Sequence, residues 1–246
     1  MVNPTKNIGK YSNKQSNKTI NKPLSEKEEE ILEYIGKLFE KNQKEFIKRL
    51  KIAEILSCSP SLVNKLLKSL EKKGLIIYEK YGVIELTDEG ALISKALIRK
   101  HRLSEALFVN LLGLEASESH EFACKLEHII NDKLLNRIEE ILNNPTVCPH
   151  GNPVPSNNNQ KTIIKGFPLS SFSINDIVTV SQITHESTTF LRNLSQMGIE
   201  VGTKIKILEK SLVDDTLLLE INGKNLSLGE KTAENLLVVL YQDGET

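Results

Sequence analysis

Side chains of the kind that bind metal ions are concentrated between residues 101 and 128 of this 246-residue chain. The stretch holds three of the five histidines and one of the three cysteines. Together with two glutamates they form two groups, His101-x3-Glu105 and His120-x3-Cys124-x2-Glu127-His128. Residues three, four, seven and eight positions apart lie on one face of an α-helix, so each group predicts a helix that presents its ligands together.

The mixture of ligand types indicates which metal ions fit. Imidazole, thiolate and carboxylate together suit a divalent first-row transition metal, whereas calcium and magnesium prefer oxygen ligands alone. A single His and Glu four residues apart is more often a hydrogen-bonded pair on a surface. Six candidate ligands in a chain with only five histidines and three cysteines favour a metal site over that interpretation.

Charge is balanced over the whole chain but not along it. Lysine plus arginine and aspartate plus glutamate number 32 each. Between residues 41 and 73, however, nine basic residues face three acidic ones, an excess of six positive charges (nine minus three). A local positive field of this kind suits a polyanionic partner such as nucleic acid.

The sequence predicts a cytoplasmic protein. It contains no run of about twenty apolar residues and no short apolar segment near its start, so neither membrane insertion nor export is expected. The cysteines Cys58, Cys124 and Cys148 are odd in number and scattered, which does not indicate a disulfide framework. A reducing compartment would leave these thiols available to a metal.

Residues 24–90 predict a winged helix-turn-helix, after a basic tail over residues 1–23 that we expect to be disordered. Ser25 and Glu28 have the spacing of a capping box, and apolar periodicity indicates helices over residues 28–40 and 47–56. Turn and cap residues at 57–61 precede a third helix over residues 62–73, which Gly74 ends. Residues 75–86 form two β-prone runs around a glycine-containing turn, as expected of a wing.

The remainder divides into a helical part and a β part. Residues 91–144 predict helices, including one capped by Ser119 and one over residues 132–143. Residues 145–170 are expected to be a linker, because Pro, Asn and Gly are frequent from residue 144 to 160. Short strands at 178–180, 204–208, 217–221 and 236–240, with one helix near 187–197, predict a small barrel over residues 171–246. The predicted fold class is therefore mainly α with a small β domain.

In a winged helix-turn-helix the third helix enters the major groove, with base contacts near its N-terminus. The residues predicted to contact DNA there are Ser59, Ser61, Asn64, Lys65 and Lys68, flanked by Lys51. The alternative is a small helical domain with lysines on its solvated face. The cap residues at the helix entrance and the hairpin behind it favour double-stranded DNA, while the low aromatic content argues against a platform for single strands.

Taken together, these segments resemble the diphtheria toxin repressor family of metal-dependent transcriptional regulators, from about residue 24 onwards. The segments that carry the resemblance are Ile52-Ala53-Glu54 with residues 62–76, Thr87-x2-Gly90, Arg99-Lys100-His101-Arg102-Leu103 with Glu105, Ala123-Cys124-x2-Glu127-His128, and Cys148-Pro149-His150-Gly151-Asn152-Pro153-Val154-Pro155. The resemblance implies a homodimer with an N-terminal winged helix-turn-helix, a helical dimerisation domain with two metal sites, and a C-terminal SH3-like (FeoA-like) barrel.

The resemblance also implies a set of metal ligands. One site would consist of Glu30, Cys124, Glu127 and His128. The other would consist of His101, Glu105 and His120, completed in some members by the C-terminal domain, where Glu186 is the best candidate. Glu33 falls where manganese-type members carry a further acidic ligand. Cys148 and His150 resemble a third site, but their Pro-Gly-Asn-Pro context favours a structural loop.

The sequence mixes features of the iron and manganese branches. A cysteine at position 124 is typical of iron-type members, in which a methionine often stands where this chain has Glu30. Manganese-type members tend to carry carboxylates at both places. Because a thiolate favours Fe(II), Co(II), Ni(II) or Zn(II) over the harder Mn(II), we expect Fe(II), with Mn(II) as the alternative and Co(II), Ni(II) or Zn(II) as ions that could bind in vitro.

Two other classes of protein compete with a metal-dependent regulator. A metalloenzyme would also use His and Glu clusters, but the sequence offers no separate nucleophile or acid–base constellation. A metal-independent helix-turn-helix regulator would leave the ligands between residues 101 and 128 without a role. These two classes fit the sequence less well, and the family resemblance implies a non-enzymatic repressor of metal homeostasis genes that binds palindromic operator DNA when loaded with metal.

Overall fold

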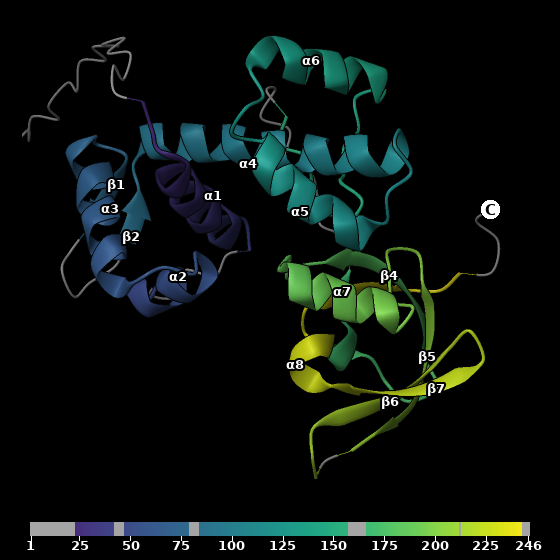
Figure 1. Ribbon diagram of the computed structural model, residues 1–246. Helices are drawn as coiled ribbons and strands as arrows, with labels where there is room; N and C mark the ends of the chain where they lie inside the picture. The colour runs from purple at the N-terminus through teal and green to yellow at the C-terminus, as the bar shows by residue number, and fades with distance from the viewer. Residues whose placement is uncertain (1–22, 42–46, 79–83, 157–165, 212, 243–246) are drawn as a thin grey trace, which may run out of the picture.

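The computed structural model describes residues 23–41, 47–78, 84–156, 166–211 and 213–242. Helices dominate up to residue 141, and a single antiparallel sheet dominates after residue 166 (Figure 1). This arrangement confirms the prediction of a mainly α chain with a small β domain. The predicted basic tail and the turn of the predicted wing lie outside the described residues.

The N-terminal unit is a winged helix-turn-helix. It consists of α1 (Glu26–Glu40), α2 (Arg49–Ile55), α3 (Pro60–Lys72) and the antiparallel strands β1 (Ile76–Tyr78) and β2 (Ile84–Leu86). The predicted capping box is present: the Ser25 hydroxyl accepts from the Glu28 amide, and the Glu28 carboxylate accepts from the Ser25 amide at 2.8 Å. Burial of the apolar faces of all three helices against the two strands forms one core.

The helical unit consists of α4 (Asp88–Asn110), α5 (Ala116–Leu126) and α6 (Asp132–Ile141). Helix α4 runs from the N-terminal unit along the helical unit and contacts α1, α5 and α6 (Figure 1). Two small residues let α1 and α4 approach closely: a Cβ added to Gly36 would lie 1.8 Å from the Ser94 hydroxyl oxygen. With glycine at position 36, the Ser94 hydroxyl has room beside α1 and donates to the Leu32 carbonyl oxygen at 2.8 Å. The ligand face of α4 is thereby fixed relative to α1.

The prediction that Ser119 caps α5 was wrong. The helix begins at Ala116, with Glu115 as its N-cap and no hydrogen bond from the cap side chain. Ser119 lies inside the first turn, and its hydroxyl donates back to the Ala116 carbonyl oxygen at 2.8 Å. Ser and Thr can make such a bond to the preceding turn as readily as they cap a helix. A serine in a polar segment therefore does not fix the helix start.

The C-terminal unit is one six-stranded antiparallel sheet that curves around an apolar core, with strand order β3-β8-β4-β5-β6-β7. Its strands are β3 (Phe167–Pro168), β4 (Ile177–Ile183), β5 (Lys204–Lys210), β6 (Thr216–Ile221), β7 (Lys224–Gly229) and β8 (Leu236–Leu240). The short helices are the 3-10 turn η1 (Leu169–Ser171), α7 (Thr188–Gln196) and α8 (Glu230–Ala233). The strands β3 and β7 were not predicted. Asn222 and Gly223 both have positive φ, as a two-residue hairpin turn between β6 and β7 requires.

The segment between the helical and C-terminal units is a folded loop up to residue 156. Val147 and Pro153 form an isolated bridge, and the Ile183 amide donates to the His150 carbonyl oxygen at 2.9 Å. Gly151 has a φ of +78°, and an added Cβ would lie 2.1 Å from the Ser181 carbonyl oxygen. The loop thus holds β4 of the C-terminal unit against the helical unit. Among the helices of the described residues, none is both long and apolar enough to span a membrane.

Candidate metal centre and DNA-reading helix

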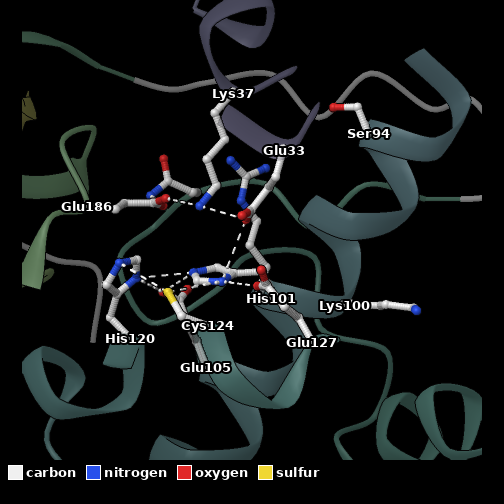
Figure 2. Close-up of polar contacts among 12 residues, drawn as sticks. Glu33, Lys37, Ser94, Lys100, His101, Glu105, His120, Cys124, Glu127 and Glu186 are labelled. Atoms are coloured by element: carbon white, nitrogen blue, oxygen red, sulfur yellow. Dashed lines mark hydrogen bonds and ion pairs between the residues drawn. The ribbon is translucent and has the colours of Figure 1, made fainter. Parts of the chain in front are cut away.

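His101 is the central residue of a buried polar cluster at the junction of α1, α4 and α5 (Figure 2). Its Nδ1 lies 2.6 Å from Glu127 Oε2, and its Nε2 lies 3.0 Å from Glu105 Oε1 and 3.1 Å from His120 Nδ1. Burial opposes a charge on this imidazole, but the carboxylates of Glu105 and Glu33 raise the pKa of His101 well above its ordinary value. In the absence of metal, a proton on His101 therefore compensates the buried carboxylates.

Helix α5 adds a thiol to this cluster. Cys124 Sγ lies 3.7 Å from His120 Nε2 and 4.0 Å from His101 Nδ1. Burial alone would raise the pKa of the Cys124 thiol, but hydrogen bonds from His101 and His120 outweigh burial and lower it to about 6. A thiol with this pKa is largely a thiolate at neutral pH, which is the form that binds metals.

The α1 helix contributes a carboxylate from the N-terminal unit. Glu33 Oε1 lies 3.6 Å from His101 Nδ1. Glu33, His101 and Glu127 each offer a ligand atom within 4.8 Å of the others, and so do His101, His120 and Cys124. Burial and the nearby Glu33 carboxylate raise the pKa of Glu127 to about 7. We call the five residues of these two overlapping groups cluster A.

A second group lies where the helical unit meets the C-terminal unit. Glu105, Cys148, His150 and Glu186 each offer a ligand atom within 4.8 Å of the others, and we call them cluster B. His150 Nδ1 lies 3.2 Å from Glu105 Oε1, while its Nε2 donates to the Ala116 carbonyl oxygen at 3.0 Å. Burial opposes the charges of this pair, but their attraction lowers the pKa of Glu105 and raises the pKa of His150. The histidine is therefore oriented by one nitrogen and faces the carboxylates with the other.

The structure brings most of the predicted ligands together. Eight of them lie in or beside the two clusters: Glu33, His101, Glu105, His120, Cys124, Glu127, His128 and Glu186. Glu30 is the exception, because its carboxylate pairs with Lys27 at 2.8 Å. The neighbouring Glu29 instead contacts His128, with 2.6 Å between Glu29 Oε2 and His128 Nδ1. The assignment of Glu30 as a ligand stays a prediction.

Cys148 and His150 lie in cluster B, although the sequence interpretation favoured a structural role for them. Their Pro-Gly-Asn-Pro context predicted a fixed loop, and the loop is indeed folded. The two side chains point from that loop into cluster B. The available signal was the Cys-x-His spacing itself, which matches metal-ligand chemistry in a chain with few cysteines and histidines.

The donor atoms fit a divalent transition metal. Within the described part of the chain, Glu105 Oε2 is a buried carboxylate oxygen without a hydrogen-bond partner. Three further buried ligand-type atoms have an ion-pair contact but no hydrogen bond: Glu33 Oε1 (2.9 Å from Lys37), His128 Nε2 (3.5 Å from Glu127) and His150 Nδ1 (3.2 Å from Glu105). Buried polar atoms without hydrogen bonds are rare, and a bound ion would satisfy such an atom. Thiolate, imidazole and carboxylate together match borderline ions rather than calcium or magnesium.

The third helix of the N-terminal unit presents polar groups at its start. Ser59 is the N-cap of α3, with its hydroxyl accepting from the Leu62 amide at 3.3 Å, and Ser61 Oγ lies 3.0 Å from Ser59 Oγ. Val63, Leu67 and Leu70 bury the opposite face. The exposed face therefore carries the residues that were predicted to contact DNA: Ser59, Ser61, Lys65 and Lys68.

Asn64 and Lys51 lie in different surroundings. The Asn64 side-chain oxygen accepts from Arg49 Nη1 at 2.8 Å and from the Tyr78 hydroxyl at 3.3 Å. These bonds connect α3 to α2 and to the wing, and they leave the Asn64 amide nitrogen as the group available to a ligand. Lys51 is half exposed and pairs with Glu54 at 3.0 Å. Such an exposed pair contributes little to stability, so the lysine can exchange partners.

Comparison with protein families places three consecutive models on this chain. Residues 23–84 match the N-terminal DNA binding domain of iron dependent repressors, and residues 87–156 match their metal binding and dimerisation domain. Residues 167–240 match the FeoA domain. The diphtheria toxin repressor of Corynebacterium efficiens is 30% identical over 173 residues, which cover 66% of this chain and 75% of that protein. The chain belongs to the diphtheria toxin repressor family.

Other members of this family match this chain over segments of different length. The diphtheria toxin repressor of Corynebacterium diphtheriae is 26% identical over 200 residues, which cover 77% of this chain and 87% of that repressor. The iron-dependent repressor IdeR of Mycobacterium tuberculosis is 39% identical over 107 residues, 44% of this chain and 46% of IdeR. The solved structure of the manganese regulator SloR superposes with a TM-score of 0.75 at 27% identity and covers 89% of this chain.

Membership of the diphtheria toxin repressor family makes the protein a metal-dependent transcriptional regulator with an SH3-like C-terminal domain. This family membership confirms the predicted fold, which combines a winged helix-turn-helix, a helical domain and a β domain. The similar proteins include both iron-dependent and manganese regulators, so the family alone leaves the metal open.

Proposed function

We propose that this protein is an Fe(II)-responsive repressor of metal homeostasis genes, which binds palindromic operator DNA as a homodimer when loaded with metal. Cluster A is the observation that carries the proposal. It combines a thiolate, two imidazoles and carboxylates, and one of those carboxylates, Glu33, comes from the unit that carries the DNA-reading helix. The other members of cluster A come from α4, from α5 and from Glu127, the C-cap of α5.

The choice of Fe(II) rests on the thiol of Cys124. Soft and borderline ions bind thiolates better than Mn(II) does, and the lowered pKa of this thiol makes the thiolate available. Mn(II) is the alternative, since Glu33 and Glu127 add oxygen ligands and the manganese regulator SloR has a similar structure. In vitro, Co(II), Ni(II) and Zn(II) should bind the same residues.

Cluster B is a candidate for the second metal site. It shares Glu105 and Glu186 with the predicted second set. Glu105 Oε1 also lies 3.0 Å from His101 Nε2 and 3.0 Å from His120 Nδ1, the other two residues of that set, so the predicted set stays an alternative. Glu186 would bring the C-terminal unit into that site. The predicted first site keeps Cys124, Glu127 and His128 as its candidates, with Glu29 or Glu30 as the carboxylate from α1.

Metal-dependent DNA binding would follow if the bound ion connected α1 of the N-terminal unit to the helical unit. A bound divalent ion would supply positive charge shared by carboxylates from both units. Glu33 and Glu29 of α1 face His101 and His128, so they can hold the N-terminal unit in one orientation. Shifting such an equilibrium from about 1:99 to 99:1 needs about 5.5 kcal/mol of differential affinity, which is within the range of transition-metal sites.

In the proposed complex, two recognition helices address the two half-sites of a palindrome. Ser59, Ser61 and Asn64 provide hydrogen-bonding groups at the start of α3, and Lys65, Lys68 and Lys51 provide charge toward phosphates. We propose the corresponding division of the chain into domains. Residues 24–90 bind DNA, residues 91–144 dimerise and bind metal, residues 145–170 form a linker, and residues 171–246 form the FeoA-like domain.

A pair of substitutions tests the proposal. His101→Ala removes the central residue of cluster A and should abolish metal-stimulated operator binding, whereas Lys65→Ala should weaken operator binding without changing metal uptake. The measurements are operator affinity by fluorescence anisotropy, with and without a chelator, and metal content of anaerobically purified protein. Operator binding by the parent protein that survives complete chelation would contradict the proposal.

A further inference from the structure

Lys37 of α1 lies between the two metal clusters (Figure 2). Its Nζ lies 2.9 Å from Glu33 Oε1 and 2.8 Å from Glu186 Oε2. The lysine side chain is 17% exposed and those of its partners are 10% and 8% exposed. An ammonium group in such surroundings is stable only when its charge is compensated, and here two carboxylates compensate it.

Each of the two carboxylates belongs to a different cluster. Glu33 is part of cluster A, and Glu186 is part of cluster B. The other oxygen of Glu186 accepts from the Asn152 side-chain amide at 2.5 Å, so this carboxylate is held between the lysine and the folded loop. Lys37 is therefore in direct contact with one candidate ligand of each cluster.

We propose that Lys37 is an internal competitor for the metal ions, which sets the metal concentration at which the protein responds. In the metal-free protein its ammonium group compensates Glu33 and Glu186, as a bound cation would. A carboxylate oxygen that coordinates an ion loses part of its attraction to the lysine, and the ion and the ammonium repel each other across a short distance. This inference rests on the proposed function, because it assumes that clusters A and B bind metal.

The competing interpretation gives Lys37 only a structural role, as a tie between α1 and the C-terminal unit. Lys41, one turn further along the same helix, provides the comparison. Its ammonium group donates to the Thr184 carbonyl oxygen, so it also reaches the C-terminal unit, but within the described part of the chain it forms no ion pair. Loss of either lysine weakens the contact between the units, whereas only loss of Lys37 removes the cation from between the ligands.

The experiment compares Lys37→Gln and Lys37→Met with the control Lys41→Gln in the full chain. Affinity for Mn(II) and for Co(II), each added alone, is measured by competition with a chelating dye, and melting temperatures are measured with and without metal. We expect both Lys37 variants to bind metal roughly tenfold more tightly than the parent, since removing one neighbouring charge is worth at least that much. Their metal-free forms should melt at lower temperature, and added metal should restore most of the difference.

Lys41→Gln should raise metal affinity much less than the Lys37 variants do, because Lys41 acts on Glu186 through its charge but forms no ion pair with it in the described part of the chain. Unchanged or weaker metal binding by both Lys37 variants would overturn the inference, and the lysine would then organise the ligands rather than compete for them. A parent protein that binds neither ion would instead contradict the proposed function itself. The two failures are therefore distinguishable in the same titration. Using two Lys37 variants guards against one of them failing to fold.

Discussion

Individual residues determine how protons and metal ions compete in cluster A. The pKa of the Cys124 thiol is about 6 and the pKa of the Glu127 carboxyl is about 7. Both groups must lose their protons to act as ligands. Burial raises the pKa of both groups. Hydrogen bonds from two imidazoles outweigh burial for the thiol, whereas a second carboxylate, Glu33, adds to the effect of burial for the carboxyl. The protonation of the cluster therefore changes within the physiological pH range.

At this scale we expect metal affinity to fall as the pH is lowered from 8 to 6. Protonation of Glu127 and then of Cys124 competes with the ion, so each proton involved weakens binding by about tenfold per pH unit below its pKa. A competition titration with Co(II) at several pH values measures the slope. Glu127→Gln should reduce the slope, because one titrating group is gone. Metal affinity that is the same at pH 6 and pH 8 would argue against both residues as ligands.

At the scale of elements, local patterns predicted helices better than strands. The capping box of α1, the Ser59 cap of α3 and the apolar periodicity all specify helices within a few residues, so α1, α3 and α6 were predicted closely. The strands β3 and β7 were missed because β3 has two residues and β7 has only two apolar side chains, Leu226 and Leu228, which is too short an alternation to stand out. Their pairing partners stabilise them, and sequence patterns within a strand do not report those partners.

Gly90 provides a prediction about how elements pack. It lies in the first turn of α4, and an added Cβ would meet the Leu75 carbonyl oxygen at 1.9 Å. In an ordinary helix Gly→Ala would stabilise by up to about 1 kcal/mol. Here the clash with the Leu75 carbonyl oxygen outweighs that gain in helix propensity. Gly90→Ala should therefore destabilise the N-terminal unit by roughly 1–3 kcal/mol. Chemical denaturation followed by circular dichroism measures the change.

The control for this prediction is Gly229→Ala. Gly229 has a φ of −67°, and an added Cβ there would meet nothing within 4 Å. Gly229 is also the N-cap of α8, where Ala is a poorer cap than Gly, so Gly229→Ala should lower the free energy of unfolding by no more than about 1 kcal/mol. Equal stability of Gly90→Ala and the parent would mean that α4 and the turn before β1 can separate without cost.

At the scale of the whole molecule, the helical unit leaves apolar side chains uncovered. Several large apolar residues at the end of α4, along α5 and on α6 are about half exposed or more: Leu111, Leu112, Phe122, Ile129, Leu134 and Ile141. Exposed apolar side chains gathered on neighbouring elements mark an interaction surface. These elements lie within the segment that matches the family's metal binding and dimerisation domain, so a second copy of this chain is the expected partner.

The double variant Leu112→Glu with Leu134→Glu should therefore weaken dimerisation at least tenfold, because two charges would be buried at the interface. Sedimentation velocity over a range of concentrations measures the change. Leu92→Glu is the matched control, since Leu92 is 69% exposed on the first half of α4. A double variant that dimerises like the parent would place the interface on another surface.

The sequence by itself determined the helical units, the caps of α1 and α3 and most of the candidate metal ligands, because these depend on spacing along one helix or on the chemistry of one side chain. Only the tertiary structure decided how the ligands are grouped. Glu105 lies beside both clusters, Cys148 and His150 reach one of them from a loop, and Lys37 lies between Glu33 and Glu186. These groupings join residues from three units, and no periodicity along the chain encodes the distance between side chains on separately folded segments.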